Sequence, residues 1–365
     1  MTDKIALVCA SLGGGGVERV VVNLARGLCG AGVEVHVYYW HDKGPQQYSI
    51  DPAVRVHRLS ASNLLARIIR LRESIKRNRY SAVISFTDVP NVVSHWAMTM
   101  LPAAPVFIAT VHTDLRRRDE LQPPSPTLRL LRWLHVRACR SATKVVVVSD
   151  RARQSIQSYY GLARDHVERI YNPILESSLV EPESSGSSKP VRLVSAGRLT
   201  QAKDFPRLIE AVKLLNSEYR YPCTLAIYGE GECRDSIDEL VSKWDLGGCI
   251  ELKGFVHDLA QELRKFDVFV LSSSWEGFGN VLVEALSAGL RVVSTDCPSG
   301  PSEILNKGQF GILVRVEGSR ALAKGIMEVG AWPSRNNRGT LQEHLRQFTI
   351  ESVTEQYLNL IARLA

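Results

Sequence analysis

The 365-residue chain lacks several features that would place it in other classes of protein. No run of 18 or more consecutive apolar residues occurs, so we expect no membrane-spanning helix. The seven cysteines are scattered and include no Cys-x-x-Cys pair, so neither a zinc site nor a disulfide framework is indicated. Aromatic residues make up 7% and no RNA-binding motif is present, which argues against a nucleic-acid partner.

The beginning of the chain also lacks a basic segment followed by an apolar one. The residues MTDKIALVCASLGGGG enter a strand-like pattern directly, so we expect no secretory signal peptide. Together with the odd number of cysteines, this favours a reducing, cytoplasmic location.

The composition that is present is globular, with an uneven charge. A hydrophobic content of 45% over 365 residues suits two domains of ordinary size. The formal net charge is +7, and residues 67–79 and 116–140 hold much of it. Basic faces of this kind favour anionic partners, such as phospholipid headgroups, pyrophosphate-linked lipids or nucleic acid.

The stretch from Ser272 to Leu305 is the part of the chain around which the rest is organised. Its pattern predicts a buried strand over 267–271, a glycine loop over 276–279, a helix over 280–288 and a second strand over 291–295. Gly277 and Gly279 allow the backbone to approach a ligand closely. The first N–H groups of a helix are free to bind an anion, and here we expect them at Asn280, Val281 and Leu282.

Two carboxylates flank this predicted anion site. Glu276 lies in the loop before the helix and Glu284 lies within the helix, with seven residues between them. A phosphate site with two acceptors for hydroxyl groups suits a nucleotide-sugar. One alternative is an ordinary β-α-β element with a solvated glutamate, and another is the carboxylate pair of a glycoside hydrolase. A hydrolase of plain glycosides has no need of an adjacent phosphate site, so we disfavour the second.

A further cluster of charge follows the predicted strand over 192–196. The segment Gly197–Asp204 carries Arg198 and Lys203, five residues apart and just before a helix. The planar guanidinium and the compact ammonium can together hold a diphosphate. The alternative interpretation is two solvated surface charges.

These motifs resemble glycosyltransferase family 4. The resemblance rests on E-G-F-G-N-V-L-V-E-A, on S-A-G-x-x-V-V-S-T-D and on G-R-L-x-x-x-K-D, and it extends over nearly the whole chain. Members of this family are retaining enzymes with the GT-B fold, in which two Rossmann-like α/β domains with parallel sheets face each other across a cleft. The resemblance therefore implies that fold here.

The resemblance also assigns expected roles to individual residues. Arg198 and Lys203 would hold the donor pyrophosphate, Glu276 would contact the sugar and Glu284 would accept hydrogen bonds from the ribose. His112, at the end of a predicted strand, would sit beside the transferred sugar; the alternative is a histidine that caps the strand end. The remaining expected substrate-binding residues are Gly15, Gly16, Glu18, Phe255, Val256, Gly277, Phe278, Gly279, Asn280, Val281 and Leu282. For Glu18, an alternative is a carboxylate stabilised by the helix dipole.

The expected domain organisation follows from composition and from the resemblance. Residues 176–190 are rich in Ser, Pro and Glu and predict a linker. It would join an acceptor-binding domain over 1–175 to a nucleotide-sugar-binding domain over 191–345. A last helix over 346–365 would cross back to the first domain.

Two predicted helices are both basic and amphipathic, over 64–79 and 127–140. Each is either a surface helix on an α/β sheet or a contact with an anionic membrane surface. The second interpretation predicts a peripheral protein on the inner face of the plasma membrane.

The sequence thus predicts a retaining hexosyltransferase that moves a sugar from a UDP-linked donor to a lipid-linked saccharide or a lipopolysaccharide or capsule intermediate. No Asp-x-Asp occurs in the chain, so we expect neither a divalent metal nor another cofactor. Three alternatives stay open: a GDP-mannose-dependent mannosyltransferase, a non-hydrolysing sugar-nucleotide epimerase of the same fold, and a catalytically idle lectin-like or nucleic-acid-binding module.

Overall fold

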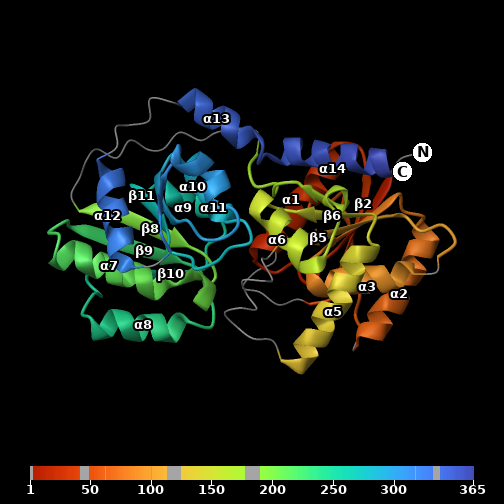
Figure 1. The fold of residues 1–365 in the computed structure, drawn as a ribbon, viewed down its shortest axis with the longest axis horizontal. Coiled ribbons are helices and arrows are strands. Elements are labelled where there is room, and N and C mark those ends of the chain that lie inside the picture. The colour runs from red at the N-terminus through yellow and green to blue at the C-terminus, as the bar shows by residue number, and fades with distance from the viewer. Residues whose placement is uncertain are drawn as a thin grey trace. The chain divides into compact units, whose positions relative to one another are not determined.

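The computed structural model describes residues 3–41, 49–61, 63–99, 101–112, 125–176, 190–316, 318–331 and 338–365. The chain forms two compact units (Figure 1). The first comprises Met1–Glu176 and Gln347–Ala365, and the second comprises Ser177–Arg346. Most of the predicted linker, residues 177–189, lies outside the described residues.

The first unit contains a seven-stranded sheet of the order β3-β2-β1-β4-β5-β6-β7. Every pairing between its neighbouring strands is parallel. The strands are β1 (Lys4–Val8), β2 (Glu34–Tyr39), β3 (Arg55–Arg58), β4 (Ala82–Phe86), β5 (Val106–Val111), β6 (Lys144–Val147) and β7 (Val167–Arg169). Parallel strands need crossover connections, and helices supply them except between β2 and β3, where the described residues contain no helix.

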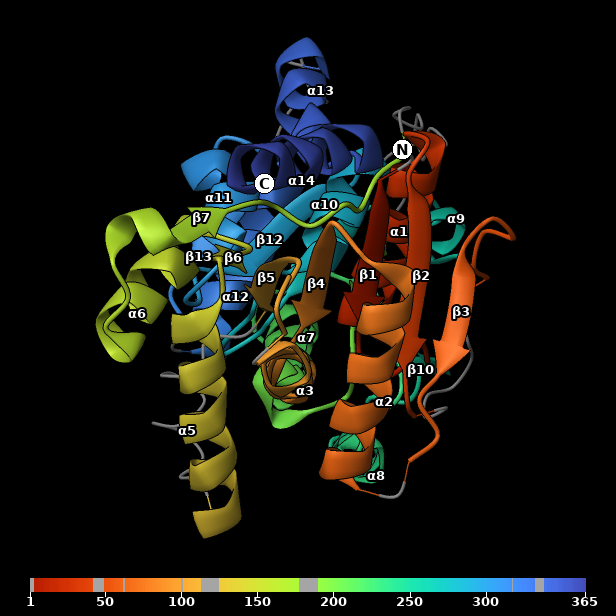
Figure 2. The ribbon, with the colours of Figure 1, turned by 90° about the vertical axis from the view of Figure 1, so that its right-hand side faces the viewer.

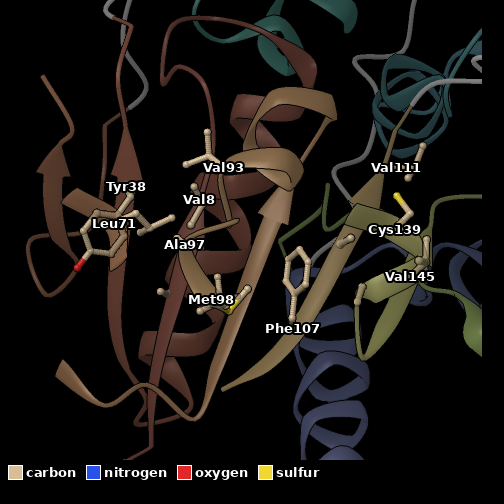
Figure 3. Packing of buried hydrophobic residues seen from close by; sticks show 14 of the residues in the cluster. Val8, Tyr38, Leu71, Val93, Ala97, Met98, Phe107, Val111, Cys139 and Val145 are labelled. Carbon is tan, nitrogen blue, oxygen red and sulfur yellow. The ribbon is translucent and has the colours of Figure 1, made fainter. Parts of the chain in front are cut away.

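The helices of the first unit are α1 (Gly16–Gly30), α2 (Leu64–Asn78), α3 (Asp88–Met98), α5 (Pro126–Ser141), α6 (Asp150–Tyr160) and α14 (Ile350–Leu364), with a 3₁₀ turn η1 (Arg164–His166). Helix α3 packs against both α2 and α5, and Figure 2 shows the three as neighbours beside the strands. Their apolar side chains meet those of the strands in one core, part of which appears in Figure 3. None of the helices in the described residues is long and apolar enough to span a bilayer.

The second unit contains a six-stranded parallel sheet of the order β10-β9-β8-β11-β12-β13. The strands are β8 (Val191–Ala196), β9 (Cys223–Tyr228), β10 (Ile250–Gly254), β11 (Val268–Leu271), β12 (Arg291–Thr295) and β13 (Ile312–Val314). The helices are α7 (Phe205–Ser217), α8 (Arg234–Lys243), α9 (Leu259–Leu263), α10 (Asn280–Ser287), α11 (Pro301–Ile304), α12 (Ser319–Gly330) and α13 (Arg338–Arg346), with 3₁₀ turns η2 (Gln201–Lys203) and η3 (Asn306–Gly308).

The prediction of two Rossmann-like parallel α/β units is confirmed. In both sheets the chain builds outward from one strand and then returns to the other side of it, so that β1 neighbours β4 and β8 neighbours β11. At such a reversal the connections from neighbouring strands diverge, and ligands of open α/β sheets bind there, outside the carboxyl ends of the strands. The fold therefore fixes where a site is to be sought in each unit.

Helix α14 belongs to the first unit, although it follows the second unit in sequence. It packs against α1, and Gly27 makes the close approach possible. A Cβ atom at Gly27 would lie 2.0 Å from the Thr354 hydroxyl oxygen and 2.9 Å from a methyl carbon of Ile350. The contact therefore depends on the missing side chain at this position.

Replacing Gly27 by alanine should loosen α14 from α1. Overpacking costs about 1–3 kcal/mol, which outweighs the gain of up to about 1 kcal/mol in helix propensity. Hydrogen exchange measured by mass spectrometry should show faster exchange across α14 in Gly27→Ala than in the wild type.

Gly30→Ala is the matched control, because a Cβ atom there meets no other atom within 4 Å on the same helix. It should leave the exchange of α14 unchanged or slower. Equal exchange of α14 in both variants would show that Gly27 does not set the contact.

Candidate functional site

The reversal point of the second sheet brings together the two charged loops that the sequence singled out. The segment after β8 carries Arg198 and Lys203, and the segment after β11 carries Glu276. Since β8 and β11 are hydrogen-bonded neighbours, their carboxyl ends and these two loops are adjacent. The candidate site is therefore assembled by the sheet from residues far apart in sequence.

Lys203 and Glu276 form a direct ion pair in this site. The Lys203 ammonium lies 2.5 Å from Oε1 of Glu276, and both side chains are largely shielded from solvent. The Ser273 hydroxyl donates a second hydrogen bond to the same oxygen, at 2.6 Å. The carboxylate is thus held by one charged and one neutral donor.

Hydrogen bonds between the two loops fix the positions from which this pair extends. Ser272 donates its hydroxyl to the Lys203 carbonyl at 2.7 Å. The backbone N–H of Ser274 donates to the Ala202 carbonyl at 2.8 Å, and its hydroxyl donates to the Asp204 carboxylate at 3.0 Å. The sequence analysis missed these three serines, and only their place between strand β11 and Glu276 signalled them.

Asp204 is itself held in an uncommon conformation. Its φ of 45° is left-handed, which costs a non-glycine residue free energy. The Arg207 guanidinium forms an ion pair with its carboxylate at 2.5 Å and donates to the Ser272 carbonyl at 3.4 Å. This pair joins the start of α7 to both loops and stabilises the turn that presents Lys203.

The stem of Lys203 passes over Gly197 at the end of β8. A Cβ atom at Gly197 would lie 2.9 Å from Cε of Lys203, so the missing side chain leaves room for the stem. Arg198 is exposed, and its guanidinium makes no hydrogen bond or ion pair with any residue that the structure describes. Of the two expected cations, one is therefore engaged by Glu276 and the other is available.

The start of α10 has the expected position after Glu276, with one difference. Gly279 precedes the helix with a φ of 96°, a conformation that favours glycine. The N–H of Leu282 donates to the Gly279 carbonyl at 2.8 Å, so the prediction of a free N–H is wrong there. The reason is a tight turn at the helix start, in which the N–H of one residue donates to the carbonyl three residues before it. Asn280 and Val281, the other two residues expected to bind an anion, are the first two residues of the helix.

The loop that precedes α10 packs closely against the loop after β12. A Cβ atom at Gly300 would lie 1.7 Å from the carbonyl oxygen of buried Phe278. Cys297 of the same loop is buried, and burial, followed by the Glu276 carboxylate, raises the pKa of its thiol to about 12. The thiol therefore stays protonated beside the ion pair.

Three further expected residues lie in the second unit. Glu284 lies within α10 and is buried, 5% exposed. Phe255 and Val256 follow β10 and are half-buried, and the Phe255 ring meets His257 edge-on at 5.5 Å. The Gly254 carbonyl before them accepts from the N–H of Gly229, which ties this segment to the end of β9.

The first unit holds the other expected residues at the ends of its own central strands. Gly15 caps the N-terminus of α1, Gly16 begins the helix and Glu18 lies in its first turn. His112 follows β5 directly. These residues form a separate set from those of the second unit.

His112 is buried, and one of its two ring nitrogens is hydrogen-bonded within the described part of the chain. Its Nε2 lies 2.9 Å from the Thr110 hydroxyl and its ring stacks on Phe86 at 5.8 Å between centroids, whereas its Nδ1 has no hydrogen-bond partner among the described residues. Burial lowers the pKa of the imidazole from 6.5 to about 4, so the ring is neutral near pH 7. A buried ring nitrogen without a partner is a group that a ligand or water can satisfy.

The described residues contain no group of three or more His, Cys, Asp or Glu side chains placed to hold a metal ion. The charged groups of the loops after β8 and β11 are two cations, Arg198 and Lys203, and two carboxylates, Asp204 and Glu276. Such a set suits an anionic ligand that also carries hydroxyl groups.

Fold and site together define the class. Residues 14–175 match the family model described as Glycosyltransferase Family 4, and residues 180–340 match the model described as Glycosyl transferases group 1. Both units of the chain thus match glycosyltransferase families, and the architecture is the GT-B fold.

Two relatives match the chain over nearly its full length. One is the lipopolysaccharide core biosynthesis glycosyltransferase LpsE of Rhizobium meliloti, 27% identical over 95% of this chain and 96% of its own. The other is an α-1,4-N-acetyl-D-galactosaminyltransferase of Campylobacter jejuni, 26% identical over 99% of both chains. Its name describes a GalNAc-containing saccharide on PP-undecaprenol as the substrate.

Solved structures show the same fold at low identity. Sucrose-phosphate synthase from Thermosynechococcus elongatus superposes with a TM-score of 0.85 at 18% identity, over 99% of both chains. HepE from Anabaena, in complex with UDP, superposes with a TM-score of 0.77 at 18% identity, over 99% of this chain and 100% of its own.

The buried, neutral His112 predicts a pH-dependent stability. Because its pKa falls from about 6.5 in the unfolded chain to about 4 in the folded one, the unfolded chain binds the extra proton first as the pH drops. The contribution of neutral His112 is complete above pH 6.5 and is lost progressively between pH 6.5 and 4, by about 3 kcal/mol in all. The free energies of unfolding of wild type and His112→Gln, measured in urea, should therefore converge as the pH falls from 6.5 to 4.

The region above pH 7 serves as the internal control, because His112 is neutral there in both the folded and the unfolded chain. The difference in unfolding free energy between the two proteins should be constant from pH 7 to 8. A difference that is equally constant from pH 7 down to 4 would contradict the assigned protonation state.

Proposed function

We propose that the chain is a retaining glycosyltransferase that moves a hexose from a UDP-linked donor to a lipid-linked saccharide or a lipopolysaccharide or capsule intermediate. The observation that carries this proposal is the juxtaposition of Lys203 and Glu276 before the start of α10. A cation for the donor diphosphate and an acceptor for sugar hydroxyls lie within one hydrogen bond of each other.

The chemistry of transfer explains why these groups are needed. As the glycosidic bond to the phosphate breaks, negative charge grows on the departing diphosphate, and donors placed in advance stabilise it. Lys203 and Arg198 supply positive charge and the N-terminal end of α10 supplies a favourable dipole. The UDP complex of HepE, a protein of the same fold, supports the choice of uridine in the donor.

Metal independence is part of the proposal and rests on this chain's own residues. No Asp-x-Asp occurs in the sequence, and two cations follow the strand next to the Glu276 loop. In this scheme they take over the charge stabilisation that a divalent cation supplies in other nucleotide-sugar enzymes.

Retention is proposed on the resemblance to family 4. The residues offer no evident nucleophile for a covalent intermediate, so we favour departure of the phosphate and attack of the acceptor on the same face of the sugar. Neutral His112 would accept or donate one hydrogen bond beside that sugar through Nδ1, and Glu284 would hold the ribose hydroxyls.

The acceptor class is proposed from the relatives. LpsE is named for lipopolysaccharide core biosynthesis, and the Campylobacter jejuni relative is named for a saccharide on PP-undecaprenol. Both names describe glycans built on lipid anchors, which would require this chain to work at a membrane surface.

Helices α2 and α5 supply a surface suited to such a membrane. Both flank α3, and they expose large apolar side chains beside arginines and, on α2, one lysine. The most exposed are Leu65 (66%), Ile69 (49%), Leu130 (58%) and Trp133 (60%). Apolar side chains within a basic face are typical of helices that lie in an anionic membrane interface. This surface supports our proposal that the protein works at the inner face of the plasma membrane.

The donor assignment predicts UDP-sugar turnover without metal. With EDTA present and membrane lipid extract as acceptor, product mass spectrometry should detect transfer from one of a panel of UDP-sugars, and not from GDP-mannose. Lys203→Ala should lower the affinity for that UDP-sugar in calorimetry by about ten- to a hundredfold, because a charge-assisted bond to a phosphate is lost.

Lys243→Ala is the control for a lost lysine, since Lys243 ends α8. It should leave the affinity for the UDP-sugar unchanged. Unaltered affinity for the UDP-sugar in Lys203→Ala would remove Lys203 from the donor site, and transfer from GDP-mannose instead of a UDP-sugar would make the enzyme a mannosyltransferase.

Membrane docking predicts that the exposed apolar residues of α5 are required for it. The double variant Leu130→Glu/Trp133→Glu should lower sedimentation with phosphatidylglycerol liposomes at least about tenfold. In the wild type, both apolar side chains would leave water on binding, which favours association, and the carboxylates remove this gain. Arg67 is a poorer target, since its guanidinium packs on the Trp40 ring at 5.2 Å and contributes to the fold.

Tyr159→Glu on α6 is the matched control, because it also replaces an exposed aromatic residue, 48% exposed, by a carboxylate. It should sediment as the wild type does. If the α5 double variant also sediments as the wild type does, the docking surface lies elsewhere on the chain.

A further inference from the structure

The Lys203–Glu276 ion pair affects how tightly the donor site binds a nucleotide-sugar compared with a free nucleoside diphosphate. In the structure, the ammonium that is proposed to hold the diphosphate is already bound to a carboxylate. A diphosphate can bind Lys203 at full strength only if it displaces that carboxylate. The ion pair therefore competes with the ligand for the same cation.

The contacts around the pair show which parts can move. The backbone on both sides is held by bonds from Ser272 and Ser274 to the segment 202–204. Ser273 is fully buried, and its carbonyl accepts a bond from the Thr295 hydroxyl at 2.6 Å. The side chain of Lys203, by contrast, runs over the bare surface of Gly197, where no Cβ restricts it. An exchange of partners thus needs only a rotation of Lys203.

The exchange leaves Glu276 with a deficit. Once Lys203 turns to a phosphate, the carboxylate keeps the Ser273 hydroxyl but loses its cation, while its side chain stays about nine-tenths buried. A buried carboxylate without its charged partner is costly. Sugar hydroxyls that donate to Glu276 would remove this cost, whereas a free nucleoside diphosphate has no such groups near it.

We propose that Glu276 holds Lys203 in place of the donor diphosphate, so that the site binds a nucleotide-sugar in preference to the free nucleoside diphosphate. This inference rests on the proposed function and adds a specificity role to Glu276. With the sugar attached, both members of the pair gain new partners. After transfer the sugar is gone, Glu276 regains Lys203, and the diphosphate product is released.

The test is the affinity for diphosphate in Glu276→Gln. The substitution keeps the shape of the side chain but removes the charge that holds Lys203. We expect the affinity of the variant for UDP and for inorganic pyrophosphate to rise at least about tenfold in calorimetry, given the strength of a close charge pair. The affinity for uridine should not change. Transfer activity should fall in the same variant, because Glu276 contacts the sugar.

A double-mutant cycle separates release of Lys203 from simple loss of a repelling charge. In the Lys203→Ala background, Glu276→Gln should give little further gain in pyrophosphate affinity. An equal gain in both backgrounds would overturn the proposal, and so would an unchanged or weaker affinity for UDP and pyrophosphate in the single variant. Glu218→Gln is the matched control: it breaks an exposed ion pair with Arg320 at the far end of α7 and should change nothing.

The pyrophosphate measurement also keeps this inference distinct from the proposed function. If neither wild type nor variant binds UDP but the variant binds pyrophosphate more tightly, the nucleotide assignment fails while the role of Glu276 stands. If wild type binds UDP and Glu276→Gln binds it no better, the donor assignment stands and the role proposed for Glu276 fails.

Discussion

The reversal of strand order at the centre of each parallel sheet is the constraint on which the rest of the structure depends. In the second unit it makes β8 and β11 neighbours, so that a loop from residue 197 and a loop from residue 272 meet at one edge. Without this pairing, Lys203 and Glu276 would be 73 residues apart with nothing to join them. The strand order brings the two residues together, and their opposite charges then form the ion pair.

The serines between β11 and Glu276 convert this topology into a defined site. Each of the three uses its hydroxyl or its backbone on a different partner, so that the carboxylate, the turn at 202–204 and the strand end are fixed relative to one another. Arg207 and the left-handed Asp204 complete the arrangement from the first turn of α7. Such support holds charged groups at short distance without requiring the backbone to move when a ligand arrives.

Much of this could be predicted from sequence, because glycine and charge at strand ends carry a local signal. The loop, the helix after Glu276 and the strand over 291–295 follow directly from the pattern of residues 267–295. The pairing of Lys203 with Glu276 carries no local signal, since it depends on which strands become neighbours. Strands β3 and β7 were not predicted either, because three or four residues with little burial show no period. Helix α13 was not predicted either, because Leu341 and Leu345 are the two apolar side chains in its sequence and are too few to show a helical period.

The attachment of α14 to α1 has a consequence for the order in which the protein is made. The groove of α1 around Gly27 receives its partner only after the whole second unit has been synthesised. On the ribosome, the first sheet and its helices therefore emerge early but stay without one covering helix while about 170 further residues are added. Until α14 has been synthesised, the residues of α1 that it covers therefore lack this partner.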